Sequence, residues 1–270
     1  MGFAIFFICH FYLAIFMQTA FYHRYASHQH FTMNKFWEKV FFVASWVVHG
    51  VGYLSPAAYA VMHKMHHAFA DKERDPHPSS NSNSMYDMYL DTKNSYINIL
   101  KKRIPVEDHF YNNVPTWPAF DKIATSKYSR LFWLVVYVAG YWFFAPNIFC
   151  WLLLPFHLLV APITGVAINW FAHQPDGVTS YTHFEQNNRS SNVLRFDFIF
   201  MGEAYHNNHH ANPRSVNLGY KWYEVDIGYL LIYTLSIFGV TKLKKKRIQS
   251  SHDTAVVQEP VTGNLEVSIK

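Results

Sequence analysis

The sequence predicts an all-α membrane protein with three or four transmembrane helices and a helical cap on one side of the bilayer. Half of the 270 residues are hydrophobic and only 15% are charged, whereas soluble domains carry about 25% charged residues. The apolar residues form long runs, and nine of the 17 histidines lie in short clusters near the ends of these runs. The modest net charge of +5 is not interleaved with aromatic side chains, so a nucleic-acid partner is not expected.

The first predicted helix is the uncharged run from Met1 to Phe21. At about 1.5 Å per residue, a helix of this length can cross a hydrocarbon core of about 30 Å. The run has neither the positive start nor the small-residue cleavage site of a signal peptide. We therefore expect a membrane helix.

Four further segments complete the predicted architecture. The apolar stretch Val40–Met62 is interrupted by glycines and a proline and is too short for two spans, so it is expected to be interfacial or re-entrant. Leu131–Ala145 and Ile148–Ile168 form a predicted helical hairpin around the turn signal Pro146-Asn147. The run Ile227–Val240 is short for a full span. No linker divides the chain, so residues 1–249 are expected to form one membrane domain, followed by a disordered tail at 250–270.

The clustered histidines indicate a metal site held mainly by imidazole. The only two cysteines, Cys9 and Cys150, lie far apart in apolar runs, which argues against a disulfide framework and a thiolate site. The candidate ligands fall into four groups along the chain: His23 and His28; His63, His66 and His67; Asn169 and His173; and His206, His209 and His210.

The second and fourth groups have the spacing i, i+3, i+4, which brings three imidazoles to one helix face, where they can serve one metal or two adjacent metals. His23 and His28 are five residues apart, about 140° around an ideal helix. They either serve different metals or lie at a distorted helix end. A single histidine in an apolar helix is usually a satisfied core residue, and this is the expected role of His10, His49 and His157. Two triplets with the same spacing are hard to assign to packing.

The topology permits one site. If all clusters meet, the chain between them must cross the membrane an even number of times, and the predicted hairpin supplies two crossings between His67 and His173. The basic segments Lys101–Arg103 and Lys242–Arg247 fall on the same side as the histidines. By the positive-inside rule, the cap and its metal site are expected to face the cytoplasm.

These groups resemble the histidine boxes of the membrane fatty acid desaturases, and among them the acyl-CoA (stearoyl-CoA, delta-9) desaturase type. The three boxes HxxxxH, HxxHH and HxxHH match residues 23–28, 63–67 and 206–210, and the resemblance runs from about Phe21 to about Val240. The family's NxxxH element matches Asn169 and His173, and implies that this histidine ligates iron while the asparagine reaches the site through a water. Relatives of this type have two membrane helices before the first box and this chain has room for one. Either the subfamily lost that helix or its start lies upstream.

The resemblance implies a site of two iron ions that uses O₂ and two electrons to introduce a cis double bond into a saturated acyl chain, at the delta-9 position of a C16–C18 chain. Imidazole suits iron, copper, nickel and zinc, so the ligands alone do not name the metal, but nine histidines exceed what one ion takes. The expected substrate is a long-chain acyl thioester or an acyl lipid. The sequence has no nucleotide, haem or ferredoxin motif, so the electrons are expected from an external donor, a ferredoxin or a small haem protein with its reductase.

Carboxylates should balance the charge of two metals and orient the imidazoles. Asp75 and Glu203 are the candidates, and the alternative for Glu203 is a charge at a helix N-terminus. Tyr59, Thr164 and Gly165 are candidates for the wall of an acyl tunnel, with packing as the alternative for each.

Three other functions compete. A di-iron fatty acid hydroxylase or an alkane monooxygenase with similar boxes would insert oxygen instead of forming a double bond. A histidine-rich membrane metal transporter would need ionisable ligands along its crossing helices, whereas these clusters lie at helix ends on one side. A bis-histidine haem protein would place single histidines on facing helices.

Overall fold

The computed structural model describes residues 2–79, 82–174 and 180–244, and these are mostly helical, as predicted. The predicted tail at 250–270 lies outside the described residues. In chain order the elements are α1 (Gly2–Met17), η1 (Gln18–Ser27), β1 (Phe31–Thr32), α2 (Lys35–His49), η2 (Gly50–Gly52), α3 (Pro56–Phe69), α4 (Met85–Leu100), η3 (Asp108–Tyr111), α5 (Pro118–Ala124), α6 (Lys127–Phe144), η4 (Ile148–Leu153), α7 (Leu154–Ala172), α8 (His206–Ala211), α9 (Ile227–Ile237) and β2 (Lys242–Leu243).

Two helices of the described residues are long and apolar enough to cross a membrane, Gly2–Ser27 and Ile148–Ala172. A third is obtained if the bent pair Lys35–Gly52 and Pro56–Phe69 counts as one span. The predicted hairpin is present as α6 and η4–α7, but α6 is not one of the two, and it begins with the polar sequence Lys-Tyr-Ser-Arg. The number of three or four spans therefore stays a prediction.

The first long helix changes character where it approaches the first histidine group. After the uncharged α1, residues Gln18–Ser27 form a π-helix, and His28 caps its end. Backbone hydrogen bonds in a π-helix reach five residues back, so the turn is wider than in an α-helix. Residues five apart, such as His23 and His28, can therefore approach the same face. Of the two alternatives for this pair, the distorted helix end is the one observed.

The interrupted apolar stretch is a sharp bend. The axes of the two halves differ by 79°. Gly50 has φ +52° at this bend, and an added Cβ would lie 2.7 Å from the Tyr137 ring of α6. Ser55 then caps α3, with Pro56 in its first turn. The chain thus turns back toward the histidines of η1, a geometry that a broken span and the predicted re-entrant segment share.

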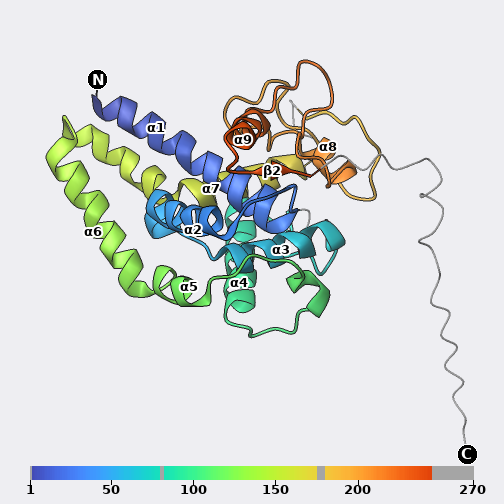
Figure 1. Ribbon diagram of the computed structural model, residues 1–270, viewed down its shortest axis with the longest axis horizontal. Helices are drawn as coiled ribbons and strands as arrows, with labels where there is room; N and C mark the ends of the chain where they lie inside the picture. The colour runs from blue at the N-terminus through green and yellow to red at the C-terminus, as the bar shows by residue number, and fades with distance from the viewer. Residues whose placement is uncertain (1, 80–81, 175–179, 245–270) are drawn as a thin grey trace, which may run out of the picture.

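The elements separate into two regions in Figure 1. The first part of α1 and the α6–α7 hairpin lie toward one end of the molecule, and α3, α8 and α9 gather at the other end. The strands β1 and β2 pair antiparallel, with Phe31 opposite Leu243, and so attach the segment after α9 to the chain just after η1. The C-terminal ends of η1, α3 and α7 converge on the short helix α8, because their histidines lie in the same groups as His206, His209 and His210.

Candidate metal centre

The nine predicted histidines come together in two adjacent groups in which the candidate ligand atoms lie within 4.8 Å of one another. The first group contains His23, His28, His63, His67 and His209, and the second contains His66, His173, His206 and His210. We call these the five-histidine group and the four-histidine group.

Both HxxHH boxes are divided between the two groups. In α3, His63 and His67 belong to the five-histidine group and His66 to the other; in α8, His206 and His210 belong to the four-histidine group and His209 to the other. On an α-helix, i+4 is displaced by about 40° from residue i, and i+3 by about 60° in the opposite direction. Each box therefore presents an i, i+4 pair to one point and its i+3 residue to a second.

The spacing of the imidazole nitrogens fits a shared cation. His67 Nε2 lies 3.0 Å from His63 Nε2 and 2.9 Å from His209 Nε2. An imidazole nitrogen carries either one hydrogen or one lone pair, so it cannot form two such hydrogen bonds at once. Ligands at right angles around an ion with metal–nitrogen distances of about 2.1 Å would be about 3.0 Å apart. In the four-histidine group, His206 Nε2 lies 3.1 Å from His173 Nε2 and 3.0 Å from His210 Nε2, which is the same spacing.

An unpaired buried nitrogen supports the same interpretation. Among the described residues, His66 Nε2 has no hydrogen-bond partner, although the whole side chain is buried. Leaving a buried polar atom unpaired costs about 1–3 kcal/mol. Burial, and then the neighbouring imidazoles, lower the pKa of His206 and of His209 well below the usual value. Neutral imidazoles keep the lone pairs that metal binding requires.

Three carboxylates accept hydrogen bonds from the outer nitrogens of these rings. Glu203 lies 2.7 Å from His23 Nδ1, and Asp75 lies 2.9 Å from His66 Nδ1. Burial raises the pKa of Asp75, but His66 and His77 outweigh it and lower the pKa to about 2, so Asp75 is a carboxylate. An Nδ1–H that donates to a carboxylate leaves the Nε2 lone pair facing the group.

The third carboxylate was not among the predicted residues. Asp71 Oδ2 accepts from His173 Nδ1 at 3.0 Å and from the backbone N–H of Arg189 at 2.7 Å. Asp71 lies four residues before Asp75, just after the second HxxHH box, and this repeat of acidic residues was the available signal.

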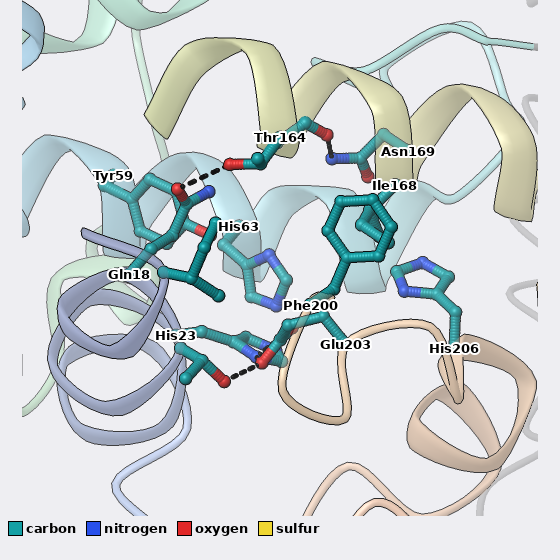
Figure 2. Close-up of a pocket in the computed structure, with 13 residues that line it drawn as sticks. Gln18, His23, Tyr59, His63, Thr164, Ile168, Asn169, Phe200, Glu203 and His206 are labelled. Atoms are coloured by element: carbon teal, nitrogen blue, oxygen red, sulfur yellow. Dashed lines mark hydrogen bonds and ion pairs between the residues drawn. The ribbon is translucent and has the colours of Figure 1, made fainter. Parts of the chain in front are cut away.

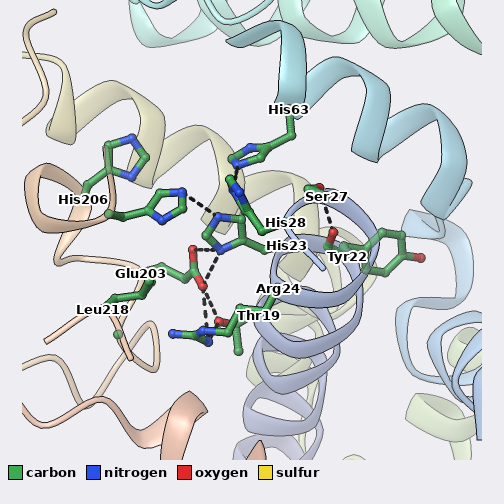
Figure 3. Close-up of polar contacts among 12 residues, drawn as sticks. Thr19, Tyr22, His23, Arg24, Ser27, His28, His63, Glu203, His206 and Leu218 are labelled. Carbon is green, nitrogen blue, oxygen red and sulfur yellow. Dashed lines mark hydrogen bonds and ion pairs between the residues drawn. The ribbon is translucent and has the colours of Figure 1, made fainter. Parts of the chain in front are cut away.

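A buried arginine extends the contacts around Glu203 (Figure 3). Arg24 is fully buried, pairs with Asp226 at 2.7 Å, and lies 3.6 Å from Glu203. The Thr19 hydroxyl donates to the same carboxylate. Arg24 and Asp226 were also missed, and the sequence signal was an arginine between the two histidines of an apolar helix end. Burial without a partner would be costly for any of these charges.

Amide side chains hold the helix α8, which carries His206, His209 and His210. Asn192 Oδ1 accepts from the backbone N–H groups of Asn207 and Asn208, at the start of α8. Asn208 Nδ2 donates to Glu224 at 2.9 Å, and Glu224 also accepts from His183 Nε2 at 2.8 Å. These contacts fix the rotation of a helix of only six residues, which its own hydrogen bonds could not do.

A central cavity opens beside both groups (Figure 2). It lies between η1, α3, α7 and the segment before α8. The predicted tunnel residues Tyr59, Thr164 and Gly165 are all on its wall, together with Gln18 and Asn169. The Asn169 amide donates to the Gly165 carbonyl at 2.8 Å, so its predicted approach to a metal through a water stays a prediction. The remaining wall includes Ile15, Thr19, His23, His63, Ile168, Phe200, Glu203 and His206.

The sequence is similar to one protein family and to several curated proteins. The sequence model of the family described as fatty acid desaturase matches residues 1–228. The sn-1 stearoyl-lipid 9-desaturase of Synechocystis sp. is 28% identical over 226 residues, which cover 82% of this chain and 64% of that protein. The Delta-9 desaturase-like 5 protein of Arabidopsis thaliana is 25% identical over 221 residues, covering 81% and 69%. The sn-1 stearoyl-lipid 9-desaturase of Anabaena variabilis is 26% identical over 223 residues, covering 81% and 75%. The chain thus spans just under two thirds of the length of the first of these relatives.

Proposed function

Because the chain belongs to the fatty acid desaturase family, we propose that it introduces a cis double bond into a saturated acyl chain, using O₂ and two electrons from an external donor. The observation that carries this proposal is the central cavity, which has His23 and His63 of the five-histidine group and His206 of the four-histidine group on its wall. A methylene pair in this cavity would be next to both groups at once.

The nine histidines would hold two iron ions. When bound, the iron pair would supply the oxygen chemistry for breaking an aliphatic C–H bond, which no side chain can deprotonate. Asp71, Asp75 and Glu203 would keep His173, His66 and His23 in the tautomer with a free Nε2 lone pair. Asn169, on the cavity wall near His206, would take part through a water.

The side chains around the cavity would position the substrate and keep water out. Ile15, Ile168 and Phe200 supply apolar surface for an alkyl chain, and Tyr59 stacks against His63 with ring centroids 5.9 Å apart. Desaturation and hydroxylation can begin with the same hydrogen abstraction, so the outcome depends on how closely the second methylene is held. Thr164 and Gly165 line the same wall and would contribute to this placement.

We propose the delta-9 position of a C16–C18 chain as the site of reaction. The relatives named 9-desaturases support this position, and two of them are named for stearoyl-lipid, which favours an acyl lipid over a thioester as the carrier. The metal centre would face the cytoplasm, where a ferredoxin, or a small haem protein with its reductase, could supply the electrons.

Expression in a host with a defined fatty-acid profile tests the proposal. Mass spectrometry of derivatised lipids should reveal new cis delta-9 unsaturation, and a His206→Ala variant should produce none. Hydroxylated chains without new unsaturation, in cells with O₂ and a competent reductant, would instead identify a hydroxylase.

A further inference from the structure

The helix α9 and the loop before α8 expose apolar side chains close to the metal centre. Of the α9 residues, only Gly228 and Ile232 are buried. Leu230, Ile237 and the adjoining Phe238 are exposed, Phe238 to 77%. Exposed apolar residues are ordinary when they are scattered, but a contiguous surface needs a partner.

The α9 helix offers water almost nothing to bind. It has no charged residue, and apart from two tyrosine hydroxyls its only polar side chains are Thr234 and Ser236. Both hydroxyls donate to carbonyls of the same helix, Thr234 to Leu230 at 2.9 Å and Ser236 to Tyr233 at 2.6 Å. A helix without a polar face is stable when all its sides are covered by protein or lipid.

The exposed face of α4 is polar, so an apolar exposed face is not common to all helices near the metal centre. The exposed positions of α4 include Asp91, Lys93 and Asn94. These side chains suit contact with water. The helix that packs on α3 and the helix that packs on η1 therefore present different surfaces.

The loop before α8 continues the apolar surface. Phe196, Phe198 and Ile199 are exposed. The Phe196 ring lies 6.3 Å from the ring of Tyr223, just before α9, and the Gly228 N–H donates to Met201 O at 3.2 Å. We call the exposed apolar side chains of these two adjoining segments the α9 surface: Phe196, Phe198, Ile199, Trp222, Leu230, Ile237 and Phe238.

The α9 surface is continuous with the candidate membrane spans. Met201 and Ile227, at its base, pack against Ala14 and Ile15 of α1 and Val160 of α7. These three partners belong to the two helices that can cross a membrane. In Figure 1, α9 lies beside the end of the α1–η1 helix. The α9 surface therefore adjoins the two helices that can cross the membrane.

The length and flanks of α9 fit a helix that lies in the boundary region of one leaflet and is too short to cross the bilayer. Eleven residues extend about 16 Å, roughly half of the hydrocarbon core. Tyr220, Lys221 and Trp222 precede it, and Trp222 is 93% exposed. Lys242 and Lys244 follow it. Aromatic and basic residues of this kind anchor segments at the boundary between lipid headgroups and acyl chains.

We propose that the α9 surface is immersed in phospholipid on the metal-centre side of the bilayer, with α9 held in the boundary region and not crossing the membrane. Phe200 and Glu203, which directly follow the exposed loop, line the central cavity. Bilayer acyl chains would therefore contact the protein next to the cavity wall. This last consequence rests on the proposed function and would favour substrates that arrive through the membrane.

Site-specific fluorescence in lipid nanodiscs tests the proposal with the full chain. Cys9 and Cys150 are replaced by serine, and an environment-sensitive fluorophore is attached in turn to Phe198→Cys, Phe238→Cys and, as the control on α4, Lys93→Cys. The labels at 198 and 238 should lose most of their fluorescence to spin-labelled phospholipid and little to aqueous iodide. The label at 93 should show the reverse.

Two results would overturn the proposal. Iodide quenching at 198 and 238 as strong as at 93 would place the surface in water, and protection from both quenchers would mean that protein covers it. A Trp222→Cys label gives an independent site if one loop variant does not fold, as judged by size-exclusion chromatography. Because fluorescence does not depend on turnover, lipid contact in a protein that forms no double bond would contradict the proposed function alone.

Discussion

The position of each histidine on its helix turn decides which of the two groups it joins. Because i and i+4 lie on one side of residue i+3, one HxxHH box supplies two ligands to one point and one to another. The box in α3 and the box in α8 do this in opposite senses, so together they supply three imidazoles to each group. The i, i+3, i+4 spacing alone left open whether one metal or two is served.

Alanine substitution of single box histidines should abolish turnover. His66 is the one ligand that α3 contributes to the four-histidine group, and His209 is the one that α8 contributes to the five-histidine group. Either substitution would leave the site incomplete while the helices still insert. Product formation in the expression host checks this. The exposed His109→Ala is the control and should retain full activity. If His66→Ala kept most of its activity, the second box would not be a ligand cluster.

Asp71 should matter although no metal would touch it. Asp71→Ala removes the acceptor of His173 Nδ1–H, and loss of such an outer partner typically costs about 10–100-fold in metal affinity or activity. Metal content and turnover of the purified variant measure the effect, with Asp91→Ala on the exposed face of α4 as the matched change in charge. Equal metal retention in both variants would show that Asp71 does not orient the ligand.

At the scale of secondary-structure elements, departures from regular helix bring the ligands together. The π-helix η1 aligns His23 with His28, and the bend between α2 and α3 returns the chain to them. A local sequence pattern indicates that the stretch is interrupted but does not give the 79° angle, because that angle depends on packing against α6. The rotation of α8 was likewise not predictable, since it is fixed by Asn192 and Glu224, which lie 15 and 16 residues away from their partners in α8 and outside any regular helical spacing.

The bend should be sensitive to one methyl group. In Gly50→Ala the new Cβ would lie 2.7 Å from the Tyr137 ring at a positive φ, and we expect a loss of about 1–3 kcal/mol in the free energy of unfolding. Gly140→Ala is the matched control, because an added Cβ there has no atom within 4 Å. Thermal unfolding in detergent compares the two. Equal melting temperatures would show that the bend tolerates the substitution.

On the scale of the whole molecule, the sequence predicted the helical class, the hairpin and the membership of the histidine clusters. Strong signals carried these predictions: long uncharged runs, the Pro146-Asn147 turn and repeated histidine spacing. The sequence did not predict contacts between distant segments. Asp71 reaches His173 across 102 residues, and Arg24 reaches Asp226 across 202, and no local pattern specifies such pairs.

The proposed cytoplasmic side of the metal centre rests on the positive-inside rule, and the shared side of the histidine groups rests on an even number of membrane crossings between them. A cysteine label in the loop that contains Ser82 and one placed after residue 250 should both be accessible from the cytoplasm. A label at Asn147, in the turn between α6 and η4, should be accessible only from the opposite face. Impermeant thiol reagents on intact cells and lysates distinguish these outcomes. Opposite sides for the first two labels would contradict a single site.

The proposed function depends on two iron ions held by the two groups of histidines in one chain. Metal analysis of the active, purified protein, with protein quantified by amino-acid analysis, tests it most directly. We expect about two irons per chain, and clearly lower iron content in His63→Ala and in His206→Ala, which each weaken one group. Full activity with a single metal ion per chain, or with zinc alone, would contradict it.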